Sequence, residues 1–254
     1  MAERVTLRHL LTHTSGIADD ADEAADESYE ALWRDRPSYA VTETADFLPQ
    51  FAHKEPVFPP GEGCRYCNCG YVLAGLALER ATGQRYRDRV RAHVLERAGM
   101  TRSGCFDMRD DEPDVVEGWE PRGDGGWRRN IYSYPPIGSP DGGAHCTAGD
   151  LVRFLRAVRN GQLLDDELTR AFLTPQVVHH VEDDGTEVHY GFGLEFVVVD
   201  GAVRSYYKEG VNTGASAYVE HHPEPDVDVA IVAATAGGAW KPRAVVTELV
   251  LAAG

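Results

Sequence analysis

The stretch GFGLEFVVVDGAVRSYYKEGVNTGASAYVEHHPEPDVDVAIVAA, residues 191–234, decides the fold of this chain. From about residue 186 the apolar residues follow the two-residue period of β-strands, whereas the preceding chain has helical spacing. The alternation predicts four strands, at 191–199, 202–208, 215–221 and 227–234. Asp200-Gly201 is a two-residue hairpin signal, and a proline-rich turn fills residues 222–226. Strands joined by such short connections form an antiparallel meander.

Helical patterns occupy the chain ahead of this meander. Apolar residues at helical spacing predict helices over 5–11, 70–82 and 86–98. Thr147-x-x-Asp150 resembles a capping box, with Asp in place of Glu, and predicts that another helix begins there.

One more helix is predicted after the meander, over residues 241–253. In it Val245, Leu249 and Val250 are available to cover the sheet. Helices first and an antiparallel sheet last indicate an α+β fold. We expect a single domain over residues 1–254, mainly helical in 1–185 and made of antiparallel strands and a terminal helix in 186–254.

Composition excludes several classes of protein. The 254 residues carry 41 Asp and Glu against 25 Lys and Arg, a formal net charge of −16 at pH 7. So acidic a chain lacks the basic face that binds DNA or RNA, and we expect no nucleic-acid partner. The 43% hydrophobic residues can form a core, which excludes wholesale disorder. The longest apolar runs, such as Val227–Ala236, are too short and too polar to span a membrane.

The five cysteines bear on compartment and on metal binding. Their odd number fits a reducing compartment, and no signal peptide opens the chain, so the cytoplasm is favoured. Cys64-x-x-Cys67-x-Cys69 has a spacing compatible with zinc. Because no second Cys-x-x-Cys and no close histidine pair completes four ligands, we interpret these residues as buried thiols and expect no metal and no cofactor.

Two segments are expected to be irregular. Residues 19–30 are densely acidic, and we interpret them as a solvated face without a function. Residues 109–143 are rich in Gly, Pro, Asp and Arg. Long irregular segments of this kind often form lids or the walls of sites.

Three local patterns in a fixed order are more specific than any one alone. They are LRHLLTHTSG at 7–16, FPPG at 58–61 followed by YCNCGY at 66–71, and Gly142-Gly143 ahead of TAGDL at 147–151. Together they closely resemble the serine β-lactamase-related family, which includes class C β-lactamases, D-alanyl-D-alanine carboxypeptidases, D-aminopeptidases and family VIII esterases. The resemblance extends over nearly the whole chain.

In that family Ser-x-x-Lys, Tyr-x-Asn and Lys-x-Gly or His-x-Gly converge on a cleft between a helical region and a sheet. Tyr66-x-Asn68 resembles the second element. The resemblance implies that Tyr66 is catalytic, because a neighbouring ammonium lowers the pKa of a phenol and lets it carry the proton of the nucleophile. It also implies that Asn68 binds the amide or ester group of the substrate.

Lys208-Glu209-Gly210 resembles the third element and lies on a predicted strand. The resemblance implies that Lys208 is catalytic, that Gly210 lets the substrate approach the backbone, and that the N–H of Val211 is an oxyanion donor. Enzymes that hold a substrate carboxylate often have Thr or Ser at the middle position. If Glu209 faces the cleft, we therefore expect an intact enzyme to prefer neutral or amine-bearing esters and amides.

The Ser-x-x-Lys element has no acceptable match. Its serine and lysine must share one helical face so that the lysine can deprotonate the serine. Ser205-x-x-Lys208 lies on a predicted strand, where these positions face opposite ways. Ser15 belongs to a turn and has no lysine at the right offset. In relatives the nucleophile segment precedes this turn, so we expect a chain that is incomplete at its N-terminus, without the first helix and strands, and inactive alone.

We interpret the protein as a serine hydrolase of the β-lactamase/D,D-peptidase/esterase type, which forms an acyl-enzyme on a small-molecule or peptide amide or ester. Its nucleophile segment is expected to be missing from this chain. Two alternatives stay open: a non-catalytic accessory or binding protein that keeps the cleft, and a thiol or zinc protein built on Cys64, Cys67 and Cys69. Because a missing N-terminal part exposes a sheet edge, we also expect poor solubility or low thermal stability.

Overall fold

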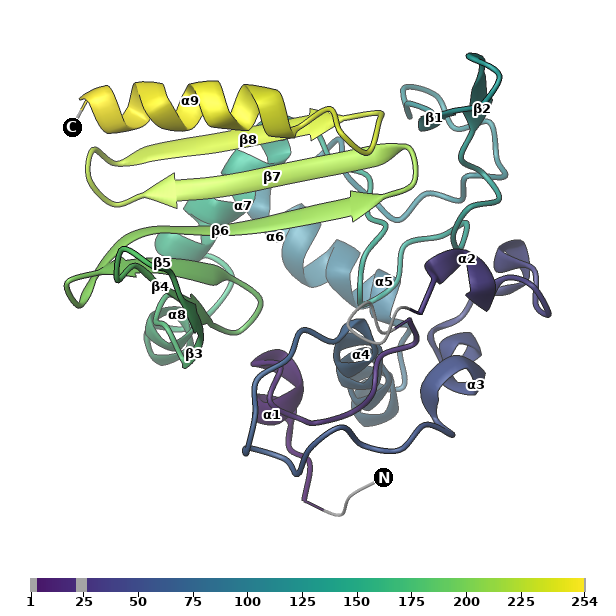
Figure 1. The fold of residues 1–254 in the computed structure, drawn as a ribbon, viewed down its shortest axis with the longest axis horizontal. Helices are drawn as coiled ribbons and strands as arrows, with labels where there is room; N and C mark the ends of the chain where they lie inside the picture. Colours follow the sequence, from purple (N-terminus) through teal and green to yellow (C-terminus); the bar gives the residue numbers. More distant parts are fainter. Residues whose placement is uncertain (1–3, 22–26, 254) are drawn as a thin grey trace.

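A computed structural model describes residues 4–21 and 27–253 of the chain. A six-stranded antiparallel sheet lies between two helices, α9 on one face and α7 on the other, and a group of helices from the first half of the chain lies beside it (Figure 1). The described part is therefore an α+β fold, as the sequence predicts.

The helical elements are α1 (Leu7–Leu11), α2 (Tyr29–Leu32), η2 (Ser38–Ala40), η3 (Thr44–Phe47), α3 (Leu48–Phe51), α4 (Asn68–Thr82), α5 (Tyr86–Val90), the π-helical turn η4 (Arg91–Leu95), α6 (Glu96–Ala98), α7 (Ala148–Arg159), α8 (Asp166–Phe172) and α9 (Trp240–Ala253). None of the helices in the described ranges combines the length and apolar character that crossing a membrane requires.

The strands are β1 (Trp119–Pro121), β2 (Trp127–Arg129), β3 (Val177–Val181), β4 (Glu187–Tyr190), β5 (Glu195–Val199), β6 (Ala202–Asn212), β7 (Ala215–His222) and β8 (Val227–Ala233). Strands β3 to β8 follow one another across the sheet in chain order, so each pairs with the next.

The predicted meander corresponds to β5–β8. Asp200 and Gly201 have positive φ angles of 52° and 75°, which suits the tight hairpin between β5 and β6. The sequence missed β3 and β4, and residues 191–194 form a bend instead of strand, closed by a 2.7 Å hydrogen bond from Gly191 N to Leu194 O. The edge strand β3 is mostly exposed, so it carries none of the apolar alternation that marks a half-buried strand.

The helices that the sequence predicts begin and end close to their expected positions, whereas α2, α3 and α8 were not predicted. At α7 one expected contact differs. The Thr147 hydroxyl accepts a hydrogen bond from Asp150 N at 3.1 Å, as an N-cap does. The Asp150 carboxylate does not complete a capping box. It accepts from Arg102 N at 2.9 Å and pairs with Arg153 at 2.6 Å, because this fully buried carboxylate has stronger donors within reach.

Helix α9 covers the sheet with fewer apolar residues than predicted. Val250 is buried, but Val245 and Leu249 are 58% and 64% exposed. Arg243 makes the main polar contact instead, because its guanidinium lies 4.1 Å from the ring centroid of Tyr218 on β7.

Three apolar clusters form the core of the described residues, and the smallest contains Ala98, Met100 and Ala157. Of the two larger clusters, one lies around α4, and the other lies between α7 and the sheet. The first contains Val41, Phe47, Phe51, Cys67, Cys69 and Val72, and the second contains Leu155, Leu194, Phe196, Val198, Tyr206 and Val219.

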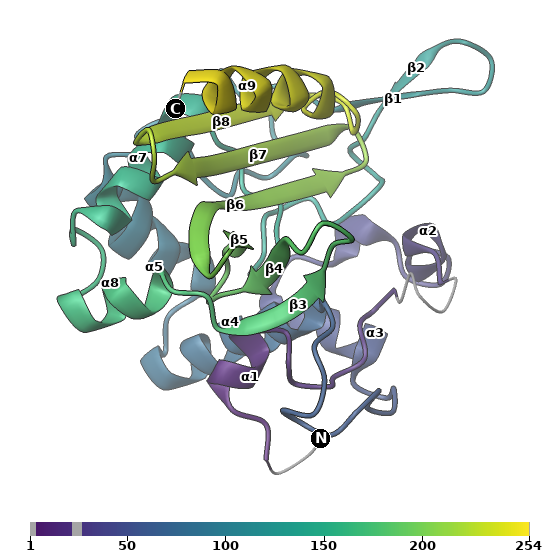
Figure 2. The same cartoon turned by 60° about the vertical axis from the view of Figure 1, so that its left-hand side comes forward.

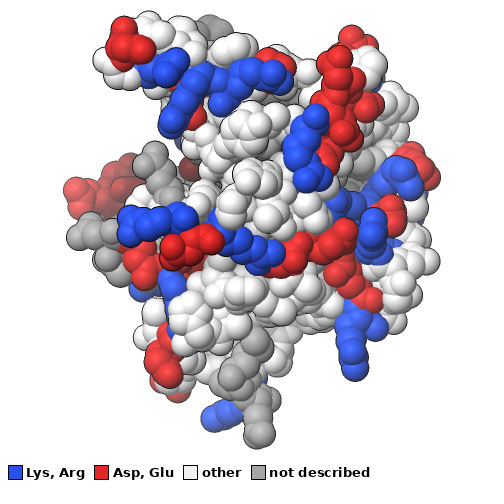
Figure 3. Space-filling model, turned by 90° about the vertical axis from the view of Figure 1, so that its right-hand side faces the viewer, with Lys and Arg blue, Asp and Glu red and all other residues white. Residues whose placement is uncertain are grey.

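Residues 109–143 are irregular apart from the β1–β2 hairpin, which projects from the body of the molecule (Figure 2). Basic and acidic side chains are interleaved on the face shown in Figure 3. On this hairpin Arg128 pairs with Glu120 at 2.8 Å, and Arg129 pairs with Glu117.

The turn at residues 12–16 is buried beneath the loop at residues 57–67. Hydrogen bonds of 2.8–2.9 Å run from Val57 N to Gly16 O, from Gly61 N to Thr14 O and from Arg65 N to His13 O. Gly16 has a φ of 69°, and a Cβ there would lie 1.9 Å from the carbonyl oxygen of Phe58. The two motifs therefore meet at a contact that only glycine allows.

We expect Gly16→Ala to lower the free energy of unfolding by at least about 2 kcal/mol more than Gly83→Ala, measured by urea denaturation. Both glycines have a left-handed φ, 69° and 68°, so both variants carry the same conformational cost. A Cβ at Gly83 meets nothing within 4 Å, whereas one at Gly16 collides with backbone. If both variants lost the same free energy of unfolding, the close approach at Gly16 would contribute nothing to stability.

Candidate functional site

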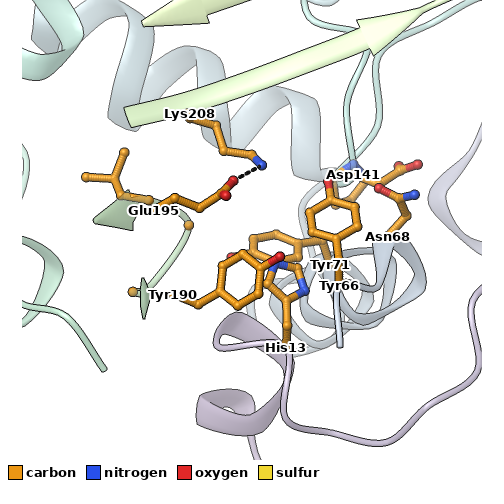
Figure 4. A pocket seen from close by; sticks show the side chains of 12 residues that line it. His13, Tyr66, Asn68, Tyr71, Asp141, Tyr190, Glu195 and Lys208 are labelled. Carbon is orange, nitrogen blue, oxygen red and sulfur yellow. Dashed lines mark hydrogen bonds and ion pairs between the residues drawn. The ribbon is translucent and has the colours of Figure 1, made fainter. Parts of the chain in front are cut away.

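A cavity of about 140 Å³ lies between the helical region and the sheet. Figure 4 shows its labelled side chains converging from opposite sides, from the turn and α4 on one side and from the sheet on the other. The lining residues are His13, Tyr66, Asn68, Tyr71, Pro140, Asp141, Tyr190, Gly191, Gly193, Leu194, Glu195 and Lys208.

Three of the residues predicted from motifs meet in this cavity. Tyr66 and Asn68 come from the start of α4, and Lys208 comes from β6, more than 130 positions later. The Lys208 ammonium lies 4.9 Å from the centroid of the Tyr66 ring. The fold thus brings together the two motifs that the sequence singles out.

The side chain of Asn68 is held in place by the hydrogen bonds that its amide nitrogen donates. Its side-chain nitrogen donates to Asp19 at 3.3 Å and to the Tyr29 hydroxyl at 2.9 Å. The amide group that Asn68 can still offer to a ligand is its carbonyl oxygen.

Asp19 organises the beginning of α4. Its two carboxylate oxygens accept hydrogen bonds from Asn68 N at 3.1 Å and Cys69 N at 2.9 Å, so it satisfies N–H groups that a helix start leaves unpaired. Asp20 is buried, and burial raises its pKa to about 7. The prediction of a solvated acidic face is therefore wrong at these two positions. Part of that predicted run, residues 22–26, lies outside the described residues.

Lys208 is already paired within the cavity. Its ammonium lies 3.2 Å from the Glu195 carboxylate, which also accepts a hydrogen bond from the Tyr207 hydroxyl at 3.2 Å. Glu195 was not predicted from the sequence, because nothing in the local pattern shows which residue of β5 lies beside Lys208 on the neighbouring strand β6.

Glu209 does not face the cavity. Successive residues of a strand point to opposite faces, and Glu209 points to the α9 side, where it lies 3.3 Å from Arg243. The expectation that its charge repels a substrate carboxylate is therefore wrong. Gly210 and Val211 continue β6 and are not among the lining residues. Their roles towards substrate stay predictions.

His13 is a lining residue that the sequence analysis left inside a structural turn. Its Nδ1 accepts a hydrogen bond from Cys67 N at 3.1 Å, and its ring lies 4.6–5.3 Å from those of three tyrosines, Tyr66, Tyr71 and Tyr190. Burial, followed by the charge of Lys208, lowers the pKa of His13 to about 3. The imidazole is therefore neutral at physiological pH. No signal in the local sequence distinguishes His13 from the rest of this turn, because its role depends on contacts with Cys67 and three tyrosines that folding brings together.

The phenol of Tyr66 is not activated by its present surroundings. Burial raises its pKa above the ordinary range, and the carboxylates of Asp19 and Glu195 add to that effect. The resemblance implies a lowered pKa, and among the described residues no ammonium produces it, because Lys208 lies over the ring and is paired with Glu195.

Asp141 reaches the cavity from the long irregular segment 109–143, which supplies a wall of the site as predicted. Its carboxylate accepts a 2.6 Å hydrogen bond from the Ser139 hydroxyl. Burial raises its pKa to about 6.

None of the cysteines, all of which lie in the described ranges, is among the residues that line the cavity. Cys67 and Cys69 are buried, as expected for small thiols, and Cys67 Sγ accepts a hydrogen bond from Gly70 N at 3.3 Å as the N-cap of α4. Cys64 lies apart, half-buried. In the described ranges Cys69 approaches Asp19 and Asp20 with ligand atoms within 4.8 Å of one another. Both carboxylates already accept backbone hydrogen bonds, so this group resembles a helix start more than a metal site.

The two serines considered from the sequence lie outside the cavity. The Ser15 hydroxyl is buried in its turn and accepts from Ile17 N at 3.3 Å. Ser205 is buried on strand β6, so it shares no helical face with Lys208.

Comparison with known proteins shows which proteins this chain is similar to. Esterase EstB of Burkholderia gladioli is 32% identical over 217 residues, which cover 77% of this chain and 55% of that protein. Penicillin-binding protein 4* of Bacillus subtilis is 26% identical over 207 residues, covering 74% of this chain and 42% of that protein. The chain thus spans about half the length of these relatives.

A solved structure shows how closely the fold agrees. The crystal structure of a penicillin-binding protein from Bacillus halodurans superposes with a TM-score of 0.91 at 37% identity, over 97% of this chain and 74% of that one. The beta-lactamase family model matches residues 2–254. The site described above thus stands in a chain that belongs to the beta-lactamase family.

Proposed function

We propose that this cavity is the proton-transfer and substrate-binding part of a serine hydrolase site that cleaves an amide or an ester through an acyl-enzyme. The supporting observation is that Tyr66, Asn68 and Lys208, from two distant segments, line one cavity. In the proposed reaction Tyr66 carries the proton of the nucleophile, and Asn68 holds the amide or ester group.

The nucleophile is proposed to come from a Ser-x-x-Lys segment outside the described residues. No serine is among the lining residues that the structure describes. The phenol of Tyr66 is protonated at neutral pH, so it needs a neighbouring cation before it can take the serine proton. The lysine of that segment would supply the positive charge that lowers the pKa of the phenol.

Lys208 contributes charge on the far side of the cavity. Its ammonium, 4.9 Å from the Tyr66 ring centroid, favours negative charge that develops on the phenol or on the substrate oxygen. Glu195 moderates that effect by pairing with it at 3.2 Å.

We expect a fluorophosphonate probe to leave the 254-residue chain unlabelled and to label a longer form that carries an upstream Ser-x-x-Lys segment, as followed by intact-protein mass spectrometry. Labelling needs a deprotonated serine, which only the longer form would contain. Replacing the serine of that segment by alanine should abolish labelling. A labelled 254-residue chain would contradict the proposal, and an unlabelled longer form would favour the accessory binding protein.

In the longer form, before any labelling, Tyr66→Phe should slow acylation about 10²–10⁴-fold, because the hydroxyl that transfers the proton is gone while the ring remains. Tyr132→Phe is the matched control, since Tyr132 is 68% exposed and does not line the cavity. Stopped-flow acylation rates measure both. Equal acylation rates in the two variants would show that the Tyr66 hydroxyl takes no part in the reaction.

Because His13 is neutral in the folded chain, the free energy of unfolding should depend on pH. Unfolded histidine binds a proton near pH 6.5, whereas folded His13 does so only near pH 3. The unfolded state therefore binds more protons between these values, and His13 makes stability fall as the pH falls through that window, by up to about 1.4 kcal/mol per pH unit.

His13→Asn isolates this effect. Asparagine keeps an acceptor for Cys67 N, tolerates the positive φ of 57° and does not titrate. We expect the free energy of unfolding to fall less steeply between pH 6.5 and about pH 4 in the variant than in the parent chain, measured by denaturant titration at each pH. Parallel pH profiles would mean that the pKa of His13 is the same in the folded and the unfolded chain.

A further inference from the structure

We propose that this cavity selects amide or ester substrates that carry a protonated amine, and that Asp141 binds the amine. This inference rests on the proposed function for its reaction, but the binding preference is a property of the cavity itself. It concerns a residue that none of the three motifs includes.

Among the charged side chains that line the cavity, the carboxylate of Asp141 is the one without a counterion in the described part of the chain. Lys208 and Glu195 neutralise each other across 3.2 Å, and His13 is neutral. Asp141 accepts a hydrogen bond from the Ser139 hydroxyl, and none of the basic side chains in the described ranges pairs with it. The lining residues together therefore carry a net negative charge, which Asp141 supplies.

A partly buried carboxylate without a cation is disfavoured, and a ligand can offset that cost. Burial raises the pKa of Asp141 to about 6, which reports that its charged form is disfavoured in the empty cavity. A ligand ammonium placed beside it restores the missing positive charge and donates charge-assisted hydrogen bonds. A ligand carboxylate would meet Asp141 as a like charge and would find Lys208 already paired.

Asp141 is held in place by its own segment. Ser139 and Gly142 exchange backbone hydrogen bonds of 2.8 and 3.1 Å, which close the turn that carries Asp141. Pro140 packs on α4 at Gly75, where a Cβ would lie 2.2 Å from Pro140 Cγ. Only glycine at position 75 therefore lets this turn approach α4 so closely.

The position of Asp141 also suits an amine-bearing amide. Figure 4 shows Asp141 and Asn68 on one side of the cavity, with Lys208 and Glu195 on the other. An amide that contacts Asn68 can therefore place an amino group on the Asp141 side. The preference for amine-bearing substrates that the sequence analysis derived from Glu209 thus has another origin, because Glu209 pairs with Arg243 on the opposite face.

Binding of three shape-matched probes to the 254-residue chain tests the proposal without any nucleophile. The probes are 4-(aminomethyl)benzamide, a cation; 4-methylbenzamide, which is neutral; and 4-carbamoylbenzoate, an anion. Affinities are measured at pH 7.5 by titration of the protein's amide NMR spectrum, with shifts required at residues that line the cavity. We expect the cation to bind about tenfold more tightly than the neutral probe and the anion to bind most weakly.

Two substitutions test the two charges separately, and both should reduce the preference for the cation over the anion. Asp141→Asn keeps the size of the side chain and should reduce the preference for the cation over the neutral probe to about one. Glu195→Gln releases Lys208 and should strengthen binding of the anion several-fold. Asp124→Asn, on the exposed β1–β2 hairpin, is the control for net charge and should change neither preference.

A cation that binds no better than the neutral probe overturns the proposal, as does a cation preference that survives Asp141→Asn in a variant whose circular dichroism melt matches the parent. Because only binding is measured, failure here leaves the acyl-enzyme proposal standing. Failure of fluorophosphonate labelling, in turn, leaves the charge preference of the cavity standing.

Discussion

The site depends on the contact between the turn at 12–16 and the loop at 57–67. Three backbone hydrogen bonds join these segments, and Gly16 is the residue without a side chain that lets them meet. The same turn presents His13, whose Nδ1 accepts from Cys67 N and thereby fixes the residue between Tyr66 and Asn68. Two motifs that are separated by more than 40 residues thus form one rigid wall, and the sheet supplies the other.

The strand period then decides which charges belong to the cavity. Along β6, Lys208 points to the cavity and Glu209 to α9, so neighbours in sequence serve different surfaces. Glu195 reaches Lys208 because β5 and β6 pair with Glu195 opposite Tyr207. The result is a cavity in which the cation is compensated and the carboxylate of Asp141 is not, and this balance carries the proposed preference for amines.

Much of the fold and part of the site could be predicted from local pattern. The hairpin at Asp200-Gly201 and the N-cap at Thr147 are decided by φ angles and by one side-chain acceptor, so neighbours in sequence suffice. Tyr66, Asn68 and Lys208 were predicted because their motifs resemble those of the serine β-lactamase-related family. Strand β3 escaped notice because an exposed edge strand needs no apolar alternation.

The sequence by itself determined the α+β order of elements and the ends of the predicted helices, since these follow from backbone preference and periodicity. Its resemblance to the family also indicated three of the residues that line the cavity. Only the tertiary structure decided that Glu209 faces α9, that Asp19 caps α4 and that Glu195 and Asp141 join the site. Those contacts join residues that are distant along the chain. Their energies depend on burial and on the charges that folding places nearby, and neither is a property of a residue and its sequence neighbours.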